Sequence, residues 1–271
     1  MEPLREVIRA LRAKKSLGQN FLSDPQILKK IVKGAEPLEG RTIIEVGPGP
    51  GGLSREIIQY PCKEIILIEQ DARCIPYLED LSSHFNGNFT LLNLDALKLP
   101  LHTFGSPPRK IIANLPYNIS VPLLLQWLKH MEDFESLTLM FQKEVAKRIM
   151  AAPNTSDYGR LSVICQWKAT VKKLFNLPPG AFLPPPKVTS TVLQLTPRHP
   201  REDVPWDALE KVVKAAFSQR RKMLRSSLKE LIPSPLTLLE DAHINPERRA
   251  EDLSVQEFCT LAALWEKGQN I

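Results

Sequence analysis

The chain has 271 residues, which is enough for one large domain or two modest ones. Hydrophobic residues make up 43% and charged residues 24%, a mix that is typical of globular proteins and argues against intrinsic disorder, and the 12 glycines show no collagen period. The formal net charge of +6 indicates a moderate preference for a polyanionic partner.

Two patterns argue against a metal protein and a membrane protein. The four cysteines form no Cys-x-x-Cys pair and no Cys/His cluster with zinc-like spacing, so we expect reduced thiols and no metal. The longest uncharged run, residues 111–128, contains Asn, Gln and Pro residues. Hydrocarbon would leave its amide groups unsatisfied, so we expect no membrane span.

The N-terminal segment MEPLREVIRALRAKK mixes acidic and basic residues, and no apolar run follows it, so we do not expect a signal peptide. Leu4, Ile8 and Leu11 recur at helical spacing, which predicts a short helix lying on the domain. A mitochondrial presequence is the alternative, and the two acidic residues of the segment count against it. We therefore expect a cytoplasmic protein, with a bacterial source favoured over an organellar one.

Strand and helix patterns alternate through the first half of the chain. Asp24 followed by Pro25 predicts a helix start, because Asp caps a helix and Pro suits its first turn. The predicted strands are the short β-rich runs Thr42–Val46, Glu64–Glu69, Phe89–Asn93, Lys110–Ala113 and Ser136–Phe141. Strands that alternate with helices are typical of βαβ units, so the sequence predicts an α/β fold with a doubly wound, mostly parallel sheet.

The pattern changes near residue 196. Residues 196–205 are polar and contain three prolines, as a linker would. Helical patterns follow at Trp206–Phe217, Lys222–Leu231, Leu236–Asp241 and Val255–Lys267. The sequence therefore predicts an α/β domain over residues 1–196 and a small all-helical domain over residues 197–271.

A glycine cluster, residues 47–52, follows the first of these strands. Glycine lets the backbone turn tightly and approach a ligand. Glu69 ends the next strand, where a carboxylate can accept hydrogen bonds from both hydroxyls of a ribose. The spacing also fits the G-x-G-x-x-G pattern of dinucleotide enzymes, but two prolines in the loop remove amide donors that a pyrophosphate would need. A nucleoside cofactor is the favoured interpretation, and a dinucleotide or an unliganded turn are the alternatives.

Polar residues also follow the third and fourth strands. Asp95 could accept a hydrogen bond from the amine of an adenine, although an Asp after a strand is also common in turns. Asn114-Leu115-Pro116-Tyr117 stands where the fourth strand ends, at the sheet edge at which doubly wound folds bind ligands. An amide oxygen, a main-chain carbonyl held outward and a flat aromatic ring together suit an amino group on an aromatic base.

The predicted helical domain holds a basic segment. Residues 211–229 contain seven Lys or Arg and no Asp or Glu. A solvated helix face normally mixes both signs of charge. A segment with one sign over this length indicates contact with an RNA backbone, and an ordinary solvated face is the alternative.

These motifs resemble, in order, those of the KsgA family of small-subunit ribosomal RNA adenine dimethyltransferases. Asn114–Tyr117 is similar to motif IV of the S-adenosylmethionine-dependent amino-methyltransferases. The further matches are Lys15–Leu22, Glu45–Leu53, Ile68–Asp71, Gln142–Ala146, Phe182–Val188 and Phe217–Lys222. These matches extend from about residue 14 to about residue 230. One position departs from the family pattern: Leu94 precedes Asp95, where the family often has a small or polar residue.

The resemblance implies a Rossmann-like methyltransferase fold, S-adenosylmethionine as cofactor and no metal. It implies transfer of methyl groups to N6 of two adjacent adenines near the 3′ end of small-subunit rRNA, within a pre-ribosomal small subunit, by a monomeric cytoplasmic enzyme. The implied cofactor residues are Asn20, Leu22, Gly47, Glu69, Asp95 and Asn114. The implied catalytic residues are Asn114 and Leu115, whose oxygens would bind N6, with Tyr117 and Phe182 on the two faces of the base. The implied RNA contacts are Arg220, Arg221, Lys222 and Arg225.

Two other functions stay open at this point. One is the related large-subunit enzyme that confers macrolide-type resistance, and the Phe217–Lys222 and Phe182–Val188 motifs favour the small-subunit enzyme over it. The other is a non-catalytic RNA-binding assembly factor that keeps the fold. The intact Asn114, Pro116 and Tyr117 argue against a loss of activity, and they leave room for a second role in ribosome assembly.

Overall fold

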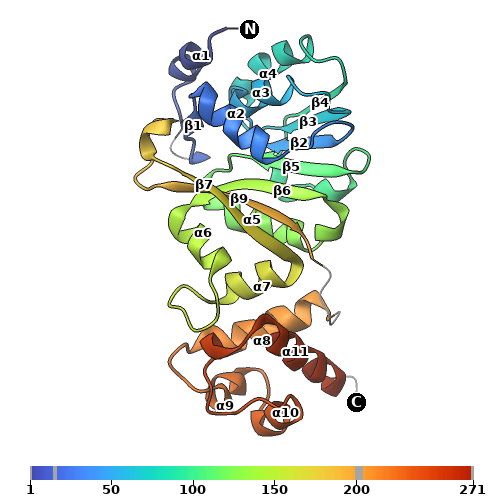
Figure 1. Cartoon of the computed structure of the whole chain (residues 1–271), viewed down its shortest axis with the longest axis vertical. Coiled ribbons are helices and arrows are strands. Elements are labelled where there is room, and N and C mark those ends of the chain that lie inside the picture. The colour runs from blue at the N-terminus through green and yellow to red at the C-terminus, as the bar shows by residue number, and fades with distance from the viewer. Residues whose placement is uncertain (1, 15–16, 199–203, 270–271) are drawn as a thin grey trace. The chain divides into compact units, whose positions relative to one another are not determined.

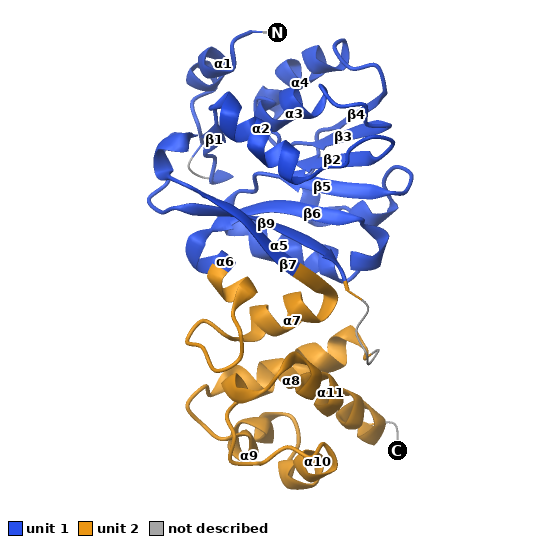
Figure 2. Ribbon diagram, in the orientation of Figure 1, with its two compact units in different colours: residues 1–146, 171–197 blue, residues 147–170, 198–271 orange. Residues whose placement is uncertain are grey.

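A computed structural model describes residues 2–14, 17–198 and 204–269. The chain divides into two compact units, residues 1–146 with 171–197 and residues 147–170 with 198–271 (Figure 2). Among the described residues, none of the helices combines the length and the apolar character that crossing a bilayer requires. All four cysteines are buried, and none of them forms a disulfide in the part of the chain that the structure describes.

The first unit is built on a seven-stranded sheet in the order β4-β3-β2-β5-β6-β9-β7, which helices flank (Figure 1). Its strands are β2 (Thr42–Val46), β3 (Glu64–Ile68), β4 (Asn88–Leu92), β5 (Arg109–Ala113), β6 (Ser136–Gln142), β7 (Ala169–Leu177) and β9 (Ser190–Pro197). The pairs β4-β3, β3-β2, β2-β5 and β5-β6 are parallel, and β9 runs antiparallel to β6. The predicted doubly wound α/β sheet is therefore confirmed.

The helices of this part of the chain are α1 (Leu4–Leu11), α2 (Pro25–Gly34), α3 (Gly52–Ile57), α4 (Ile75–Ser82), α5 (Tyr117–Leu128) and α6 (Lys143–Met150). Helix α2 begins where the sequence predicts, because the Asp24 carboxylate accepts hydrogen bonds from the backbone N–H groups of Gln26 and Ile27. The predicted N-terminal helix is present as α1, which buries Val7, Ile8 and Leu11. Short 3-10 turns occur at Ala72–Cys74, Ala96–Lys98, Leu101–Thr103, Met131–Asp133 and Pro179–Ala181.

The central strands are nearly continuous in apolar residues and are buried, as a sheet covered on both faces requires. A small second sheet pairs β1 (Phe21–Leu22) with β8 (Phe182–Leu183) in antiparallel register. The sequence did not predict β1, β7, β8 or β9. Strands β1 and β8 have only two residues each, and polar and exposed residues interrupt β7, so these three show no clear strand pattern. Strand β9 does contain a β-rich run, TVLQL, which was the signal that could have identified it.

The second unit contains α7 (Arg160–Lys168), α8 (Trp206–Ser218), α9 (Leu224–Ser227), α10 (Pro235–Asp241) and α11 (Val255–Gln269), with 3-10 turns at Leu228–Glu230 and Ala250–Asp252. The sequence assigned residues 147–170 to the first domain, whereas the structure groups them with the C-terminal helices. The physical reason is aromatic packing. The rings of Trp167 and Trp206 lie 5.7 Å apart, and those of Tyr158 and Phe217 lie 6.1 Å apart. The predicted linker falls partly on residues 199–203, outside the described residues.

Candidate active site

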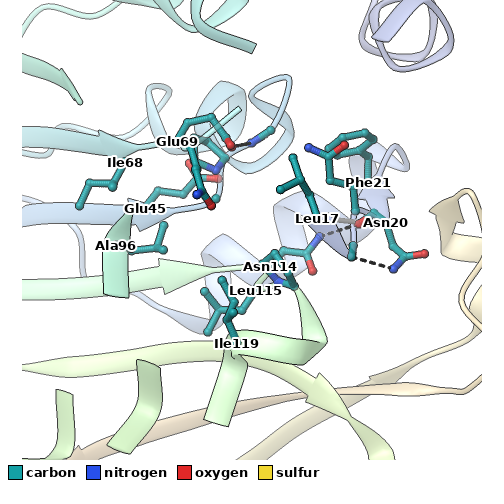
Figure 3. A pocket seen from close by; sticks show the side chains of 18 of the residues that line it. Leu17, Asn20, Phe21, Glu45, Ile68, Glu69, Ala96, Asn114, Leu115 and Ile119 are labelled. Carbon is teal, nitrogen blue, oxygen red and sulfur yellow. Dashed lines mark hydrogen bonds between the residues drawn. The ribbon is translucent and has the colours of Figure 1, made fainter. Parts of the chain in front are cut away.

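The parallel strands β4, β3, β2 and β5 end at one edge of the sheet, and the polar residues that follow them meet there. This is the switch point of a doubly wound sheet. On one side of β2 lies β3, the next strand in the chain, and on its other side lies β5, so the strand order reverses its direction here. A cavity of about 210 Å³ opens at this edge (Figure 3). Its walls come from the strand ends and from residues 17–22 of the N-terminal segment.

The glycine loop between β2 and α3 has a backbone that only glycine adopts readily. Gly47, Gly49 and Gly51 have φ angles of 67°, 56° and 83°, in the left-handed region. A Cβ atom on Gly49 would lie 2.7 Å from the Phe21 ring, so this residue also packs where a side chain would not fit. At Gly47 the nearest atom to such a Cβ is Pro116 Cδ at 3.7 Å, and both residues line the cavity. The loop therefore leaves a bare backbone facing a ligand.

Glu69 is held in a fixed orientation at the end of β3. Its Oε2 accepts the Gly49 N–H at 2.8 Å, and its Oε1 accepts the Asp71 N–H at 2.7 Å. Each carboxylate oxygen keeps a second lone pair for a hydroxyl of a ligand. The side chain is only 6% exposed, and burial raises the pKa of this carboxyl although its backbone hydrogen bonds act the other way.

Glu45 is a site residue to which the sequence interpretation gave no role. It lies in β2, is 1% exposed and lines the same cavity as Glu69. Its Oε2 accepts a hydrogen bond from the Ser54 hydroxyl at 2.6 Å. Burial raises its pKa to about 8, with the Ser54 hydrogen bond opposing this shift and the neighbouring Glu69 adding to it. An acidic residue inside the apolar strand TIIEV was the signal that could have identified it.

The N-terminal segment reaches the cavity through Asn20. Asn114 donates its Nδ2–H to the Asn20 carbonyl oxygen at 3.2 Å, which directs the opposite amide atom, Oδ1, away from this bond. Asn20 itself donates a side-chain N–H to the Gly18 carbonyl oxygen. The two dashed bonds appear together in Figure 3. Asn114 therefore presents an acceptor whose orientation is set before any ligand binds.

A charged cluster ties the same N-terminal segment to the strand that carries Glu69. The Asp71 carboxylate accepts a hydrogen bond from Gln19 at 2.9 Å and pairs with Arg73 at 2.5 Å. Arg73 also donates to the Leu11 carbonyl oxygen at 2.5 Å. These bonds hold the pKa of Asp71 well below its usual range, with Arg73 the largest cause. The cavity wall formed by residues 17–22 is thus anchored to β3.

Leu115, Pro116 and Tyr117 complete one wall. Leu115 is buried, Pro116 precedes the first residue of α5, and the Tyr117 hydroxyl shares a hydrogen bond of 2.6 Å with the Ser190 hydroxyl on β9. Burial raises the pKa of Tyr117, so this hydroxyl stays protonated at neutral pH. The hydrogen bond to the buried Ser190 fixes the ring of Tyr117 at the cavity.

Asp95 and Leu94 line the cavity at the end of β4. Asp95 caps a short 3-10 turn, since its Oδ1 accepts the Leu97 N–H at 3.0 Å. Leu94, the departure from the family pattern, is 48% exposed. An exposed leucine here adds an apolar surface next to the Asp95 carboxylate.

Most of the predicted site residues meet in this one cavity. Its lining contains Asn20, Leu22, Gly47, Glu69, Asp95, Asn114, Leu115 and Tyr117. Phe182 differs, because it is 1% exposed, packs in the hydrophobic core opposite Leu22 in the β1–β8 pair, and does not line the cavity. To cover one face of a base, as the sequence predicts, the ring would first have to leave this core, and that role stays a prediction.

The predicted RNA contacts belong to the second unit. Arg220 donates to the Glu251 carboxylate at 2.8 Å and to the Thr155 carbonyl oxygen at 3.3 Å. Arg225 lies 3.8 Å from the Glu247 carboxylate. Arg221 and Lys222 are exposed and, within the described part of the chain, pair with no carboxylate. Of the four predicted RNA contacts, Arg220 and Arg225 thus face carboxylates, whereas Arg221 and Lys222 are exposed and have no ion pair among the described residues.

One group of possible metal ligands is present among the described residues. Donor atoms of His102, His130 and Asp133 lie within 4.8 Å of one another. The two imidazole rings are stacked with centroids 3.6 Å apart and planes 10° from parallel. Imidazole lone pairs lie in the ring plane, so those of parallel stacked rings do not converge on one point. The absence of a metal stays a prediction.

A sequence model of the family described as "Ribosomal RNA adenine dimethylase" matches residues 10–267. The chain is 49% identical over 267 residues to the "Ribosomal RNA small subunit methyltransferase A" of Sinorhizobium medicae, covering 97% of each chain. A protein of the same name from Ruegeria sp. is 47% identical over 277 residues, covering 99% of this chain and 98% of the relative.

Solved structures share the fold. A dimethyladenosine transferase from Plasmodium falciparum superposes with a TM-score of 0.79 at 27% identity, covering 92% of this chain and 98% of that one. The 23S rRNA methyltransferase ErmE superposes with a TM-score of 0.66 at 24% identity, covering 91% of this chain and 100% of that one. At its lower identity, the second likeness concerns the fold alone.

Proposed function

Because the chain belongs to the ribosomal RNA adenine dimethylase family, we propose that it transfers methyl groups from S-adenosylmethionine to N6 of two adjacent adenines near the 3′ end of small-subunit rRNA. The observation that carries this proposal is the Asn114 side chain. Its Nδ2 is engaged by the Asn20 carbonyl oxygen at the rim of the cavity that also holds Glu69 and the glycine loop. An oriented amide acceptor beside a nucleoside-sized pocket suits an exocyclic amine.

The residues present fit S-adenosylmethionine. The Glu69 carboxylate would offer one lone pair on each oxygen to the two ribose hydroxyls, and Asp95 would offer an acceptor to the adenine amine. The bare backbone at Gly47 would admit a ligand close to the loop, and Asn20 and Leu22, which line the same cavity, would border the methionine end. When bound, S-adenosylmethionine supplies an electrophilic methyl group on a positively charged sulfur.

The residues of this chain make N6 able to attack. The N6 lone pair is delocalised into the adenine ring, so the amine is a poor nucleophile. The Asn114 Oδ1 and the Leu115 carbonyl oxygen would accept its two hydrogens and favour a tetrahedral nitrogen. Tyr117, held by Ser190, would stack on the base and stabilise the positive charge nearby. Positioning and electrostatics then supply most of the acceleration, and the protonated product amine loses its proton to water.

The same hydrogen bonds explain why a second methyl group can be transferred and why no third transfer follows. Monomethylated N6 keeps one hydrogen for Asn114 or Leu115, whereas dimethylated N6 has none. The target base must leave its stack to enter the cavity. We propose that exposed cations of the basic segment, Arg221 and Lys222 first, bind RNA phosphates in a pre-ribosomal small subunit. The proposed enzyme is a cytoplasmic monomer without a metal.

The large-subunit methyltransferase is the second candidate. Its support is the ErmE superposition, which concerns the fold only, whereas the relatives at 47–49% identity are named for the small subunit. A non-catalytic assembly factor is a third candidate that the intact Asn114–Tyr117 wall disfavours.

The deciding experiment is primer extension on rRNA after incubation with S-adenosylmethionine. Three substrates are compared: naked small-subunit rRNA, assembled small subunits and large subunits. We expect stops at two adjacent adenines in small-subunit rRNA and none in the large subunit. Stops in large-subunit rRNA alone would support the second candidate, and no stops in any substrate would contradict the proposed activity.

A further inference from the structure

Glu45 is a buried acid in the wall of the cavity. It lies between Ile44 and Val46 in a fully buried strand, and the one hydrogen bond on its carboxylate that the structure describes comes from Ser54. Nine residues separate Ser54 and Glu45 along the chain. A buried carboxylate normally requires a cation or several donors to stay ionised. Within the described part of the chain no basic side chain forms an ion pair with Glu45.

The charged groups on the elements packed against Glu45 do not neutralise it. On β3 the nearest charged group is another acid, Glu69. On α3, Arg55 donates to the backbone oxygen of Glu2. On β5, Lys110 is bound to the Ala35 carbonyl oxygen and to Glu135.

The two acids of the cavity wall therefore compete for ionisation. Glu69 receives two backbone N–H groups, whereas Glu45 receives one hydroxyl. More donors stabilise a carboxylate, so Glu69 ionises first and its charge opposes ionisation of Glu45. Burial and Glu69 together give Glu45 a pKa of about 8, so this carboxyl holds its proton at neutral pH in the free protein.

The proposed ligand changes this balance. S-adenosylmethionine carries a sulfonium charge, and its product, S-adenosylhomocysteine, is an uncharged thioether at the same sulfur. A positive charge in a cavity lined by Glu45 and Glu69 favours the ionised carboxyl, because Coulomb interactions are strong where water is excluded.

We infer that Glu45 releases its proton to solvent when S-adenosylmethionine binds, and that it takes up a proton again once methyl transfer has left S-adenosylhomocysteine in the site. This inference rests on the proposed function. The residue is a positioning residue for the cofactor charge. The proton release makes the site selective, because the ionised Glu45 stabilises bound S-adenosylmethionine and not S-adenosylhomocysteine. Methyl transfer therefore lowers the affinity of the site for the product.

The test is isothermal titration calorimetry of both ligands at pH 7, in phosphate and in Tris, whose ionisation enthalpies differ. For the wild-type protein we expect S-adenosylmethionine to release up to about 0.9 proton, the protonated fraction for a pKa of about 8, and the product to release much less. In Glu45→Gln this release is abolished, and the preference for the donor over the product falls by about tenfold.

Ser54→Ala is the matched control. It removes the hydrogen bond and keeps the titrating carboxyl, whereas Glu45→Gln keeps an acceptor for Ser54 and removes the titration. We expect Ser54→Ala to retain the proton release. If Glu45 only tethers α3, Ser54→Ala and Glu45→Gln will weaken both ligands alike, and the wild-type protein will show no difference in proton release between them.

A ligand-free measurement adds a second readout. The folded pKa of Glu45 lies above the unfolded value of 4.5, so its contribution to stability is complete below pH 4.5 and is lost as the pH rises through about 8. The melting temperature of the wild-type protein should therefore fall more than that of Glu45→Gln between pH 6 and pH 8.5. Parallel pH profiles would overturn the inference.

The two hypotheses fail in different ways. Binding of S-adenosylmethionine with proton release that persists in Glu45→Gln would assign the proton to another group and overturn this inference alone. No binding of S-adenosylmethionine to the wild-type protein would overturn the proposed function and this inference together.

Discussion

The cavity wall and the basic segment use polar residues in opposite ways. In the cavity, Glu69 and Asn114 are held by hydrogen bonds to the backbone, and burial removes water from the Glu69 carboxyl. In the basic segment, Arg221 and Lys222 are exposed and no carboxylate among the described residues fixes them. The first arrangement orients a few groups toward defined atoms of a ligand, and the second supplies charge without a fixed direction.

This difference predicts how substitutions will act. Loss of an oriented, buried group leaves its partners unsatisfied and affects one step strongly. Loss of an exposed cation removes one weak, salt-dependent interaction among several. Four variants, three single and one double, test this difference, and their expected effects decrease in the order given.

The largest effect is expected for Asn114→Ala in single-turnover methylation with saturating cofactor and small subunits. The acceptor for N6 is used mainly in the transition state, so its loss should lower the rate by about 10²–10³-fold, or about 3–4 kcal/mol. Asn114→Asp keeps an acceptor and should retain more activity than Ala. The control is Asn86→Ala, an exposed turn residue outside the cavity. A near wild-type rate in Asn114→Ala would reduce this residue to a turn former.

Glu69→Ala should weaken S-adenosylmethionine binding by about 2–4 kcal/mol, since it removes a charged acceptor of two hydrogen bonds. Calorimetry without RNA measures this directly. Glu64→Gln is the control, because Glu64 lies at the opposite end of the same strand. Unchanged affinity in Glu69→Ala, or tighter binding of NADH than of S-adenosylmethionine, would contradict the nucleoside site and revive the dinucleotide alternative.

Gly49→Ala tests whether the glycine loop requires a glycine where it packs against Phe21. The left-handed φ alone costs an alanine about 1–2 kcal/mol of unfolding free energy. Gly40→Ala is the matched control, since Gly40 has φ 70° but no atom within 4 Å of its added Cβ, whereas that of Gly49 would overlap Phe21. Urea denaturation should show a larger loss of stability for Gly49→Ala. Equal losses would mean that the Phe21 contact has no energetic weight.

Much of the α/β unit could be predicted from the sequence, because its signals are local. The five predicted strands agree with β2 to β6 within one or two residues, since each is a short apolar run bounded by turn residues. Gly47, Glu69, Asp95 and Asn114 could be predicted as site residues for the same reason, since parallel strands carry the residues that follow them to one sheet edge, whereas Asn20 and Leu22 came only from the family resemblance.

What the sequence missed depends on contacts between distant residues. Phe182 lies in a recognisable motif, yet its pairing with β1 buries it, and nothing near it in the sequence shows that pairing. Residues 147–170 join the helical unit because of ring contacts such as Trp167 with Trp206. Glu45 was passed over because its neighbour Glu69 and its partner Ser54 are brought to it only by folding.

The smallest effect per residue is expected in the basic segment. Arg221→Ala with Lys222→Ala should weaken RNA binding whatever the RNA sequence, and it should lower the slope of log K against log salt by about 0.7–0.9 for each phosphate that the variant no longer binds. The comparison is Arg220→Ala with Arg225→Ala, whose side chains face Glu251 and Glu247. Because Arg220 also binds the Thr155 carbonyl oxygen, that pair should lower the melting temperature, which the exposed pair should leave unchanged. An identical salt slope for Arg221→Ala with Lys222→Ala and for the wild-type protein would mean that this part of the segment is an ordinary solvated surface, and that RNA binding relies on other cations.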